Sequence, residues 1–166
     1  KRQILINGDD KNQKKYDVHK HIVFGRNKNF NYDFKEKSND FVNVLFDSFL
    51  FDTNLYGRYN YSNVCAAIAL GLEFGIDKNE INHSLKNYQS KNNRSEVIKV
   101  GNKRIILDAY NANPSSMYAS IKNFIETNFK NKILILGDMY ELGVDEIKYH
   151  QDCLLYTSDA ADDLYR

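Results

Sequence analysis

Hydrophobic positions recur along this chain with two different spacings, and the spacing changes near residue 61. Before that point, residues 3–7 and 21–25 form short apolar runs, which predict strands. Residues 30–34 alternate aromatic with polar side chains, and residues 41–55 are apolar at nearly every second or third position. This pattern favours further strands but leaves a helix open for residues 41–55.

Two helices are predicted next, because apolar residues then recur three or four positions apart. The first helix covers residues 61–74, and Gly75 is a natural stop for it. The second helix begins with Asp77 as N-cap and Glu80 as capping-box partner, and it ends near Tyr88. Its buried stripe is predicted to consist of Ile81, Leu85 and Tyr88.

The second part of the chain opens with a polar segment, residues 89–93, which we interpret as the boundary between two domains. Residues 96–100 and 103–107 then flank a Gly-Asn pair, which favours a hairpin. Residues 104–138 are predicted to form one right-handed βαβ unit, in which two buried strands enclose an amphipathic helix. The order of elements predicts an α/β fold in two small domains.

Each strand of this βαβ unit is followed by a loop that carries an aspartate. Asp108 follows an Ile-Ile-Leu run, and Asp138 follows the run Lys-Ile-Leu-Ile-Leu at residues 132–136 after one glycine. Pro114 fits the first position of the intervening helix, with Asn113 as its N-cap. Because the carboxyl ends of parallel strands share one edge of a sheet, we expect both acidic loops at the edge where ligands bind.

Composition narrows the classes of protein and of partner. The chain has 166 residues, of which 42% are hydrophobic, enough for a packed core. Its net charge of +1 gives no global field that would attract nucleic acid or a membrane. No apolar segment approaches the roughly 20 residues that span a bilayer, and Cys65 and Cys153 do not suggest a disulfide framework. The cytoplasm is the expected compartment.

Four polar residues are candidate nucleotide contacts, and each has an ordinary structural role as the alternative. Asn60 and Asn63 lie at the start of the first predicted helix, where they either cap it or meet a base or phosphates. Arg94 lies at the predicted domain boundary and is either solvated or in contact with a phosphate. Asp108 either forms a turn or binds ribose hydroxyls or a metal.

The remaining candidates lie in the loops that follow the two predicted strands. Asn111 and Asn113 either present amides to a substrate or form the turn into the helix, and both can take unusual backbone angles. Asp138 has the same ambiguity. His150 has no partners at metal-ligand spacing, so no metal site is predicted. None of the eight glycines is followed by the Lys-Ser or Lys-Thr of a P-loop, so no complete catalytic centre is evident.

Five blocks of sequence, taken in order, resemble the Mur ligases. They lie at residues 7–10, 53–63, 93–95, 108–114 and 137–143. The Asp-Ala-Tyr-Asn-Ala-Asn-Pro and Gly-Asp-Met-Tyr-Glu-Leu-Gly blocks are typical of the member that adds D-alanyl-D-alanine, whereas the block with Asn60 and Asn63 is shared across the family. The resemblance extends over about residues 3–150.

The resemblance implies a place for this chain within a three-domain enzyme. Residues 1–91 would be the C-terminal part of a central P-loop-type ATPase domain, and residues 92–151 the start of a Rossmann-like C-terminal domain. Residues 152–166 resemble translated sequencing-adapter DNA and are expected to be a non-native, poorly ordered tail. The family's P-loop, carbamylated lysine and magnesium-binding glutamate have no counterpart here, so we expect an inactive fragment. A third domain cut after its first βαβ unit would leave sheet edges and apolar helix faces uncovered, so we also expect marginal stability or aggregation.

The activity implied by the resemblance is that of an ATP-dependent amide ligase in peptidoglycan synthesis, and so in cell-wall biogenesis, cell shape and division. ATP would phosphorylate UDP-N-acetylmuramoyl-tripeptide, and the amine of D-alanyl-D-alanine would attack the acyl phosphate, with magnesium as cofactor. The enzyme is expected to be a cytoplasmic monomer without nucleic-acid or membrane partners. The family's site residues would be Asn60 and Asn63 near adenine, Arg94 at the phosphates, Asp108 at the ribose, and Asn111 and Asn113 in the substrate cleft.

Two alternatives stay open. Another ligase of the superfamily, of the folylpolyglutamate synthase type, would share the nucleotide site, but residues 108–114 argue against it. A nucleotide-binding module without catalysis would bind ATP unaided and would begin with a start codon.

Overall fold

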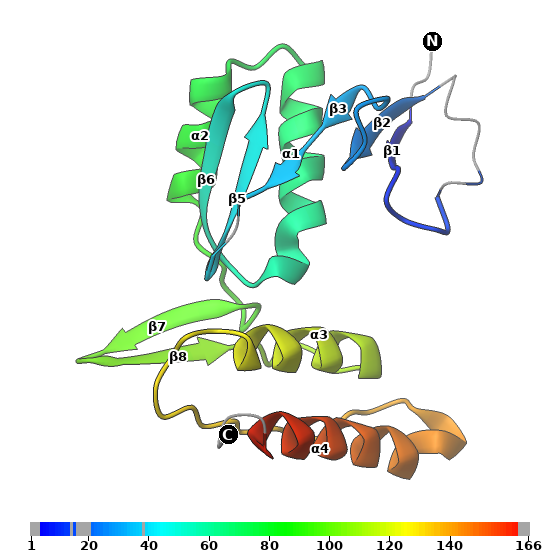
Figure 1. Cartoon of the computed structure of the whole chain (residues 1–166), viewed down its shortest axis with the longest axis vertical. Coiled ribbons are helices and arrows are strands. Elements are labelled where there is room, and N and C mark those ends of the chain that lie inside the picture. Colours follow the sequence, from blue (N-terminus) through cyan, green and yellow to red (C-terminus); the bar gives the residue numbers. More distant parts are fainter. Residues whose placement is uncertain (1–3, 14, 16–20, 38, 163–166) are drawn as a thin grey trace. The chain divides into compact units, whose positions relative to one another are not determined.

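The computed structural model describes residues 4–13, 15, 21–37 and 39–162 (Figure 1). The chain forms two compact units, Lys1–Gln89 and Ser90–Arg166, and each is described here by itself. Residue 3 of the first predicted strand and residues 163–166 of the predicted tail lie outside the described residues. Helices and strands mix in both units, so the predicted α/β class is confirmed.

The strands of the first unit form two small sheets. The parallel sheet has the order β1 (Leu5–Asn7), β2 (Ile22–Gly25) and β3 (Tyr32–Asp33). The antiparallel sheet has the order β4 (Lys35–Glu36), β5 (Phe41–Phe46) and β6 (Phe49–Tyr56). The strands predicted in residues 3–7, 21–25 and 30–34 are therefore confirmed, and residues 41–55 are strands rather than helix.

The helices of the first unit follow the short 3₁₀ helix η2 (Arg58–Asn60). They are α1 (Tyr61–Glu73) and α2 (Lys78–Asn87), close to the predicted bounds. Gly75 takes the positive φ of 73° that a helix stop requires, and the Asp77 side chain caps α2 by accepting from the Asn79 N–H. Tyr88 is 54% exposed, so its predicted burial is wrong, because α2 ends one residue earlier and its backbone turns extended.

Both sheets of this unit share one hydrophobic core with the two helices. Helix α1 contacts β1, β2 and β5, and α2 contacts β6 (Figure 1). The core residues come from every one of these layers: Phe24, Phe34, Val42, Val44, Phe51, Tyr61, Val64, Cys65, Ile68, Ala69 and Ile81.

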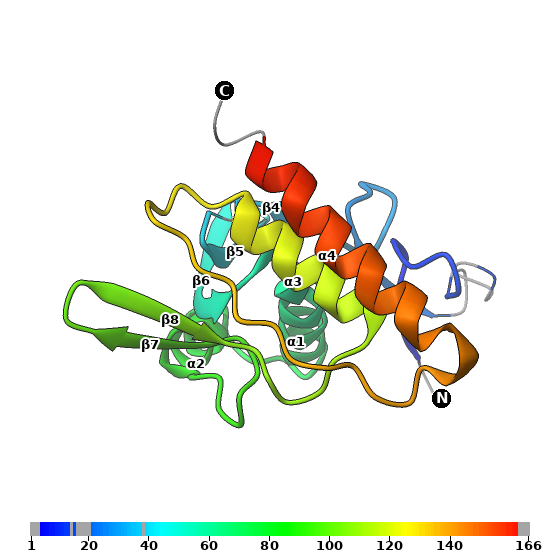
Figure 2. The same cartoon turned by 90° about the horizontal axis from the view of Figure 1, so that it is seen from below.

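The second unit begins with the predicted hairpin, β7 (Glu96–Val100) and β8 (Lys103–Leu107), which is confirmed with Val100 opposite Lys103. It continues with α3 (Pro114–Ile125), the 3₁₀ helix η3 (Gly143–Asp145) and α4 (Glu146–Asp162). Helices α3 and α4 lie side by side in both views (Figures 1 and 2). The buried residues of this unit that the structure describes are Ser95, Ile121, Asn123 and Met139.

The predicted βαβ unit is wrong, because residues 132–136 do not form a strand. Ile133 and Ile135 are 79% and 91% exposed, and β8 pairs only with β7 among the described strands. A strand exists only if a neighbour accepts and donates its backbone hydrogen bonds, and an apolar run cannot supply that neighbour. The two acidic loops therefore do not share the edge of a parallel sheet.

The predicted poorly ordered tail also differs from the structure, since α4 continues through Asp162. Leucine and alanine, which are good helix formers, recur in residues 154–161, and α4 contacts α3. The non-native origin of residues 152–166 stays a prediction.

We expect truncation to alanine to destabilise the first unit strongly at Ile68, which is fully buried. The same truncation should have little effect at Leu70, which lies on the same helix and is 50% exposed. Ile68→Ala should lower the free energy of unfolding by about 2–5 kcal/mol, and the isomeric change Leu70→Ala by less than about 1 kcal/mol. Burial raises the pKa of the Cys65 thiol to about 12, so this thiol reacts only when the unit opens.

Alkylation of Cys65 in increasing urea, in a Cys153→Ser background, therefore measures this difference. The urea midpoint should fall for Ile68→Ala and stay near that of the parent for Leu70→Ala. Equal shifts for the two variants would contradict the packing of α1.

The N-cap of α2 should make the first unit sensitive to acid. The backbone N–H of Asn79 holds the pKa of Asp77 below its ordinary value of 3.8. The carboxylate therefore contributes stability that is complete above pH 3.8 and lost as the pH falls through the lower folded pKa. Asp77→Asn keeps a capping oxygen but cannot titrate.

The difference in free energy of unfolding between the parent and Asp77→Asn should be constant above pH 3.8 and should shrink as the pH falls from there through the lower folded pKa. Urea denaturation at a series of pH values measures it. A difference that does not change with pH would show that the carboxylate does not cap the helix as a charge.

Candidate functional site

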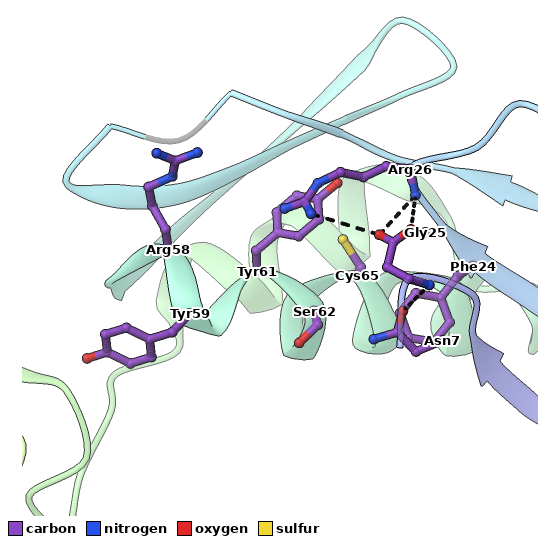
Figure 3. A pocket seen from close by; sticks show the side chains of 10 residues that line it. Asn7, Phe24, Gly25, Arg26, Arg58, Tyr59, Tyr61, Ser62 and Cys65 are labelled. Atoms are coloured by element: carbon purple, nitrogen blue, oxygen red, sulfur yellow. Dashed lines mark hydrogen bonds and ion pairs between the residues drawn. The ribbon is translucent and has the colours of Figure 1, made fainter. Parts of the chain in front are cut away.

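The first unit has a small pocket where the carboxyl ends of β1 and β2 meet the first turns of α1 (Figure 3). Its volume is about 180 Å³, and Asn7 and Gly25 line it from the strands while Tyr61, Ser62 and Cys65 line it from α1. Strand ends and a helix N-terminus commonly meet a ligand in parallel α/β sheets. The pocket is therefore a candidate ligand-binding site.

The charged side chains around this pocket neutralise one another. Arg26 donates to Glu36 Oε2 at 2.9 Å, and Arg58 Nε donates to Glu36 Oε1 at 2.8 Å. The backbone N–H of Arg26 lies 3.1 Å from both carboxylate oxygens of Asp9. The guanidinium of Arg26 also lies 4.2 Å from the ring centroid of Tyr61. These arginines hold the pocket wall together rather than offering unneutralised charge to a phosphate.

The pocket also lacks an activated nucleophile among its described residues. Burial raises the pKa of Cys65 to about 12 and raises the pKa of Tyr61 further still. Both groups are therefore protonated and neutral near pH 7, and a neutral thiol is a poor nucleophile.

Asn60 and Asn63 are brought together beside this pocket, at the N-terminal end of α1. Asn60 occupies the N-cap position, but its side chain makes no capping hydrogen bond. Its Nδ2 donates instead to the Tyr56 carbonyl at 2.9 Å, and Asn63 Nδ2 donates to Asn60 Oδ1 at 3.3 Å. Asn63 is exposed. The capping alternative is therefore wrong for Asn60, and the pair presents amide groups at the surface.

Arg94 and Asp108 are brought together in the second unit. Asp108 Oδ1 accepts from the Ser95 N–H, and Asp108 Oδ2 accepts from the Ser120 hydroxyl, both at 3.0 Å. The Arg94 guanidinium lies 3.6 Å from the ring centroid of Tyr110. Asp108 therefore joins the loop before β7 to α3, a structural role different from the turn considered for it, while its side chain stays exposed.

Asn111 and Asn113 lie in the loop between β8 and α3. Asn113 is the N-cap, as predicted: its Oδ1 accepts from the Ser116 N–H at 3.0 Å, and its own N–H donates to Ser116 Oγ at 3.1 Å. Neither asparagine is among the described residues with positive φ, so the predicted unusual backbone angles are wrong. Asn113 has φ −140° because a residue before proline is confined to extended backbone.

The loop that carries Asp138 is held by a histidine that the sequence did not single out as a contact. The N–H of the buried Met139 donates to His150 Nε2, and His150 Nδ1 donates to the Glu146 carbonyl, both at 2.9 Å. With Nε2 as acceptor, the ring is neutral and carries its proton on Nδ1. His150 therefore has a structural role, since it joins the loop at Met139 to α4.

The described residues offer neither a metal site nor a membrane span. They contain no group of three or more His, Cys, Asp and Glu side chains placed to hold a metal ion. None of their helices has the length and hydropathy needed to cross a membrane. The candidate nucleotide contacts thus form two groups: Asn60 with Asn63 in the first unit, and Arg94 with Asp108 in the second.

Comparisons with known proteins agree on one family. The model of the Mur ligase, glutamate ligase domain, matches residues 93–165. The UDP-N-acetylmuramoyl-tripeptide–D-alanyl-D-alanine ligase of Bacillus subtilis is 40% identical over 102 residues, which cover 60% of this chain and 22% of that ligase. The corresponding ligase of Treponema pallidum is 32% identical over 123 residues, which cover 74% of this chain and 27% of that ligase.

Among solved structures, MurF from Acinetobacter baumannii matches with a TM-score of 0.68 and 26% identity, over 81% of this chain and 30% of that one. The chain therefore spans between a fifth and a third of the length of these relatives, 22% to 30%. Both the sequence matches and the fold agree with the resemblance seen in the sequence, and on this evidence the chain belongs to the Mur ligase family.

Proposed function

We propose that this chain is part of an ATP-dependent amide ligase of peptidoglycan synthesis, which joins D-alanyl-D-alanine to UDP-N-acetylmuramoyl-tripeptide. The observation that carries the proposal is the similarity to ligases of that name, at 40% identity over 102 residues for the Bacillus subtilis enzyme. The blocks at residues 108–114 and 137–143 support this member of the family over a folylpolyglutamate synthase. Residues 1–91 and 92–151 would belong to its central and C-terminal domains.

The second unit offers groups that fit a nucleotide. Arg94 is exposed and keeps a guanidinium available for phosphate oxygens. The exposed Asp108 carboxylate accepts from the Ser95 N–H and the Ser120 hydroxyl, and such a carboxylate is the kind of acceptor that a ribose hydroxyl needs. Bound ATP would supply the phosphoryl group that activates the substrate carboxylate, and these two residues would bind and orient it.

The first unit would contribute the amides of Asn60 and Asn63 to the adenine region. An amide carries both a donor and an acceptor, which suits the edge of a base. The bond from Asn60 to the Tyr56 carbonyl fixes that side chain, and Asn63 is turned to solvent. Asn60 would thus set the position of the pair, and Asn63 would make the more accessible contact.

The substrate cleft would include Asn111 and Asn113 in different ways. Asn113 Oδ1 already accepts from Ser116 and from the Ser115 hydroxyl, so it would act mainly by fixing the start of α3. Asn111 is exposed and free to present its amide to a peptide. Magnesium would be a further cofactor, held by side chains that lie outside this chain. The complete enzyme would work as a cytoplasmic monomer, and cell shape and division would depend on it.

The ligase activity can be tested with a longer reading frame that contains this sequence and reaches the length of its relatives. Supplied with ATP, the protein should release phosphate in the presence of UDP-N-acetylmuramoyl-tripeptide and D-alanyl-D-alanine. It should release none when glutamate replaces the dipeptide. Release with glutamate would favour the folylpolyglutamate synthase type, and ATP binding without any release would favour the binding module.

The adenine contact can be tested at Asn63 in this chain. Asn63→Ala should leave the free energy of unfolding within about 0.5 kcal/mol, because alanine suits an exposed helical position. It should weaken ADP binding about two- to tenfold, the usual effect of one hydrogen bond. Isothermal titration calorimetry measures the affinity, and the exposed Asn29→Ala serves as the control. Equal affinities for the two variants would exclude Asn63 from the site.

A further inference from the structure

The guanidinium of Arg94 is held by an aromatic ring rather than by a carboxylate. The central guanidinium carbon, Cζ, lies 3.6 Å from the ring centroid of Tyr110, well within the range of a cation–π contact. Among the described residues no carboxylate forms an ion pair with Arg94, whereas Arg26 and Arg58 both pair with Glu36. The ring therefore orders Arg94 without neutralising its charge.

The backbone that carries Arg94 is also fixed onto the segment that carries Tyr110. Three residues around it have left-handed backbone angles, with φ of 60° at Asn92, 58° at Asn93 and 50° at Ser95. Asparagine tolerates such angles, but at a serine they are uncommon and indicate a backbone that surrounding contacts hold in place.

Those contacts come from the segment after β8. The Asn93 carbonyl accepts from the N–H groups of Ala109 and Tyr110, at 2.8 and 3.1 Å. The Ser95 N–H donates to Asp108 at 3.0 Å. The Ser90 hydroxyl also donates to the Arg94 carbonyl. The backbone of Tyr110 thus fixes the loop of Arg94, and its ring fixes the end of the side chain.

A free arginine side chain loses considerable rotamer entropy when it binds an anion. A side chain that is already stacked has lost part of that entropy before the ligand arrives, so more of the interaction appears as affinity. A flat guanidinium stacked by its face keeps its N–H groups at the edge, pointing outward for phosphate oxygens. A lysine ammonium would not be oriented in this way.

We propose that Tyr110 is a positioning residue that holds the Arg94 guanidinium ready for a nucleotide phosphate. The inference rests on the proposed function, because it takes Arg94 as the phosphate contact. It assigns the effect to the aromatic ring and not to the hydroxyl, so phenylalanine should replace tyrosine at this position without loss.

The stacking is tested first in the full chain without ligand, by NMR. In the parent chain and in Tyr110→Phe, the ring current should shift the Arg94 Hδ and Hε resonances upfield. In Tyr110→Leu this shift should disappear, while the amide of Ser95 should remain protected from exchange. Unshifted Arg94 resonances in the parent chain would overturn the proposal.

The consequence for binding is tested by calorimetry with ADP as the probe. Tyr110→Leu should weaken ADP binding about two- to fivefold, the usual effect of an exposed cation–π contact. Tyr110→Phe should bind as the parent does, and so should Tyr118→Leu, which changes another tyrosine of the same unit that is 48% exposed. In an Arg94→Ala background, Tyr110→Leu should have no further effect.

The outcomes separate this inference from the proposed function. If Arg94→Ala weakens ADP binding and Tyr110→Leu does not, the phosphate role of Arg94 stands and the positioning role of Tyr110 is overturned. If Tyr110→Leu still weakens binding when Arg94 is absent, the ring acts in another way and the inference is again wrong. If Arg94→Ala binds ADP as the parent does, the inference fails at its premise, and the ligase assay decides the proposed function independently.

Discussion

The first unit depends on the burial of α1 between strands of two different sheets. Neither sheet has more than three strands, so each is small and gains stability from a helix packed against it. Val64, Cys65 and Ile68 are at most 1% exposed because they belong to the core that α1 forms with strands of both sheets. A Cβ added at Gly71 would lie 2.9 Å from Ile81 Cδ1, so this glycine allows α2 to approach α1 closely. The core of this unit thus joins two sheets and two helices, and α1 contacts strands of both sheets.

This packing also sets the N-terminal end of α1, where the candidate adenine contacts lie. Gly57 turns the chain from β6 into η2 with φ 92°, a backbone conformation that a side chain would strain. Asn60 then reaches back to the Tyr56 carbonyl, which ties the helix start to the end of the sheet. The arginines of the neighbouring pocket are neutralised by Glu36 and Asp9, so electrostatics there stabilise the wall of the pocket.

The second unit is organised more by hydrogen bonds than by burial. Asp108 joins the loop before β7 to α3, and His150 joins the loop at Met139 to α4. Both side chains accept hydrogen bonds from backbone N–H groups outside the strands, and Asp108 also accepts one from a hydroxyl. Polar residues of this kind can hold a loop and still present charge or amides to a ligand. The same region therefore combines structural hydrogen bonds with the candidate contacts of a nucleotide.

The sequence by itself determined the hairpin, the positions of α1, α2 and α3, and the caps at Asp77 and Asn113. These local features depend on neighbours a few residues apart, so periodicity and turn residues reveal them. The sequence also indicated the family, through five blocks whose order along the chain needs no structure to be read. Only the tertiary structure decided that residues 132–136 lack a strand partner, that Arg94 stacks on Tyr110, and that His150 holds a loop. A sequence pattern indicates which face of a segment is apolar. Strand pairing, a cation–π contact and a side-chain hydrogen bond to a distant loop each need a second segment nearby in space, and the pattern does not give that segment's position.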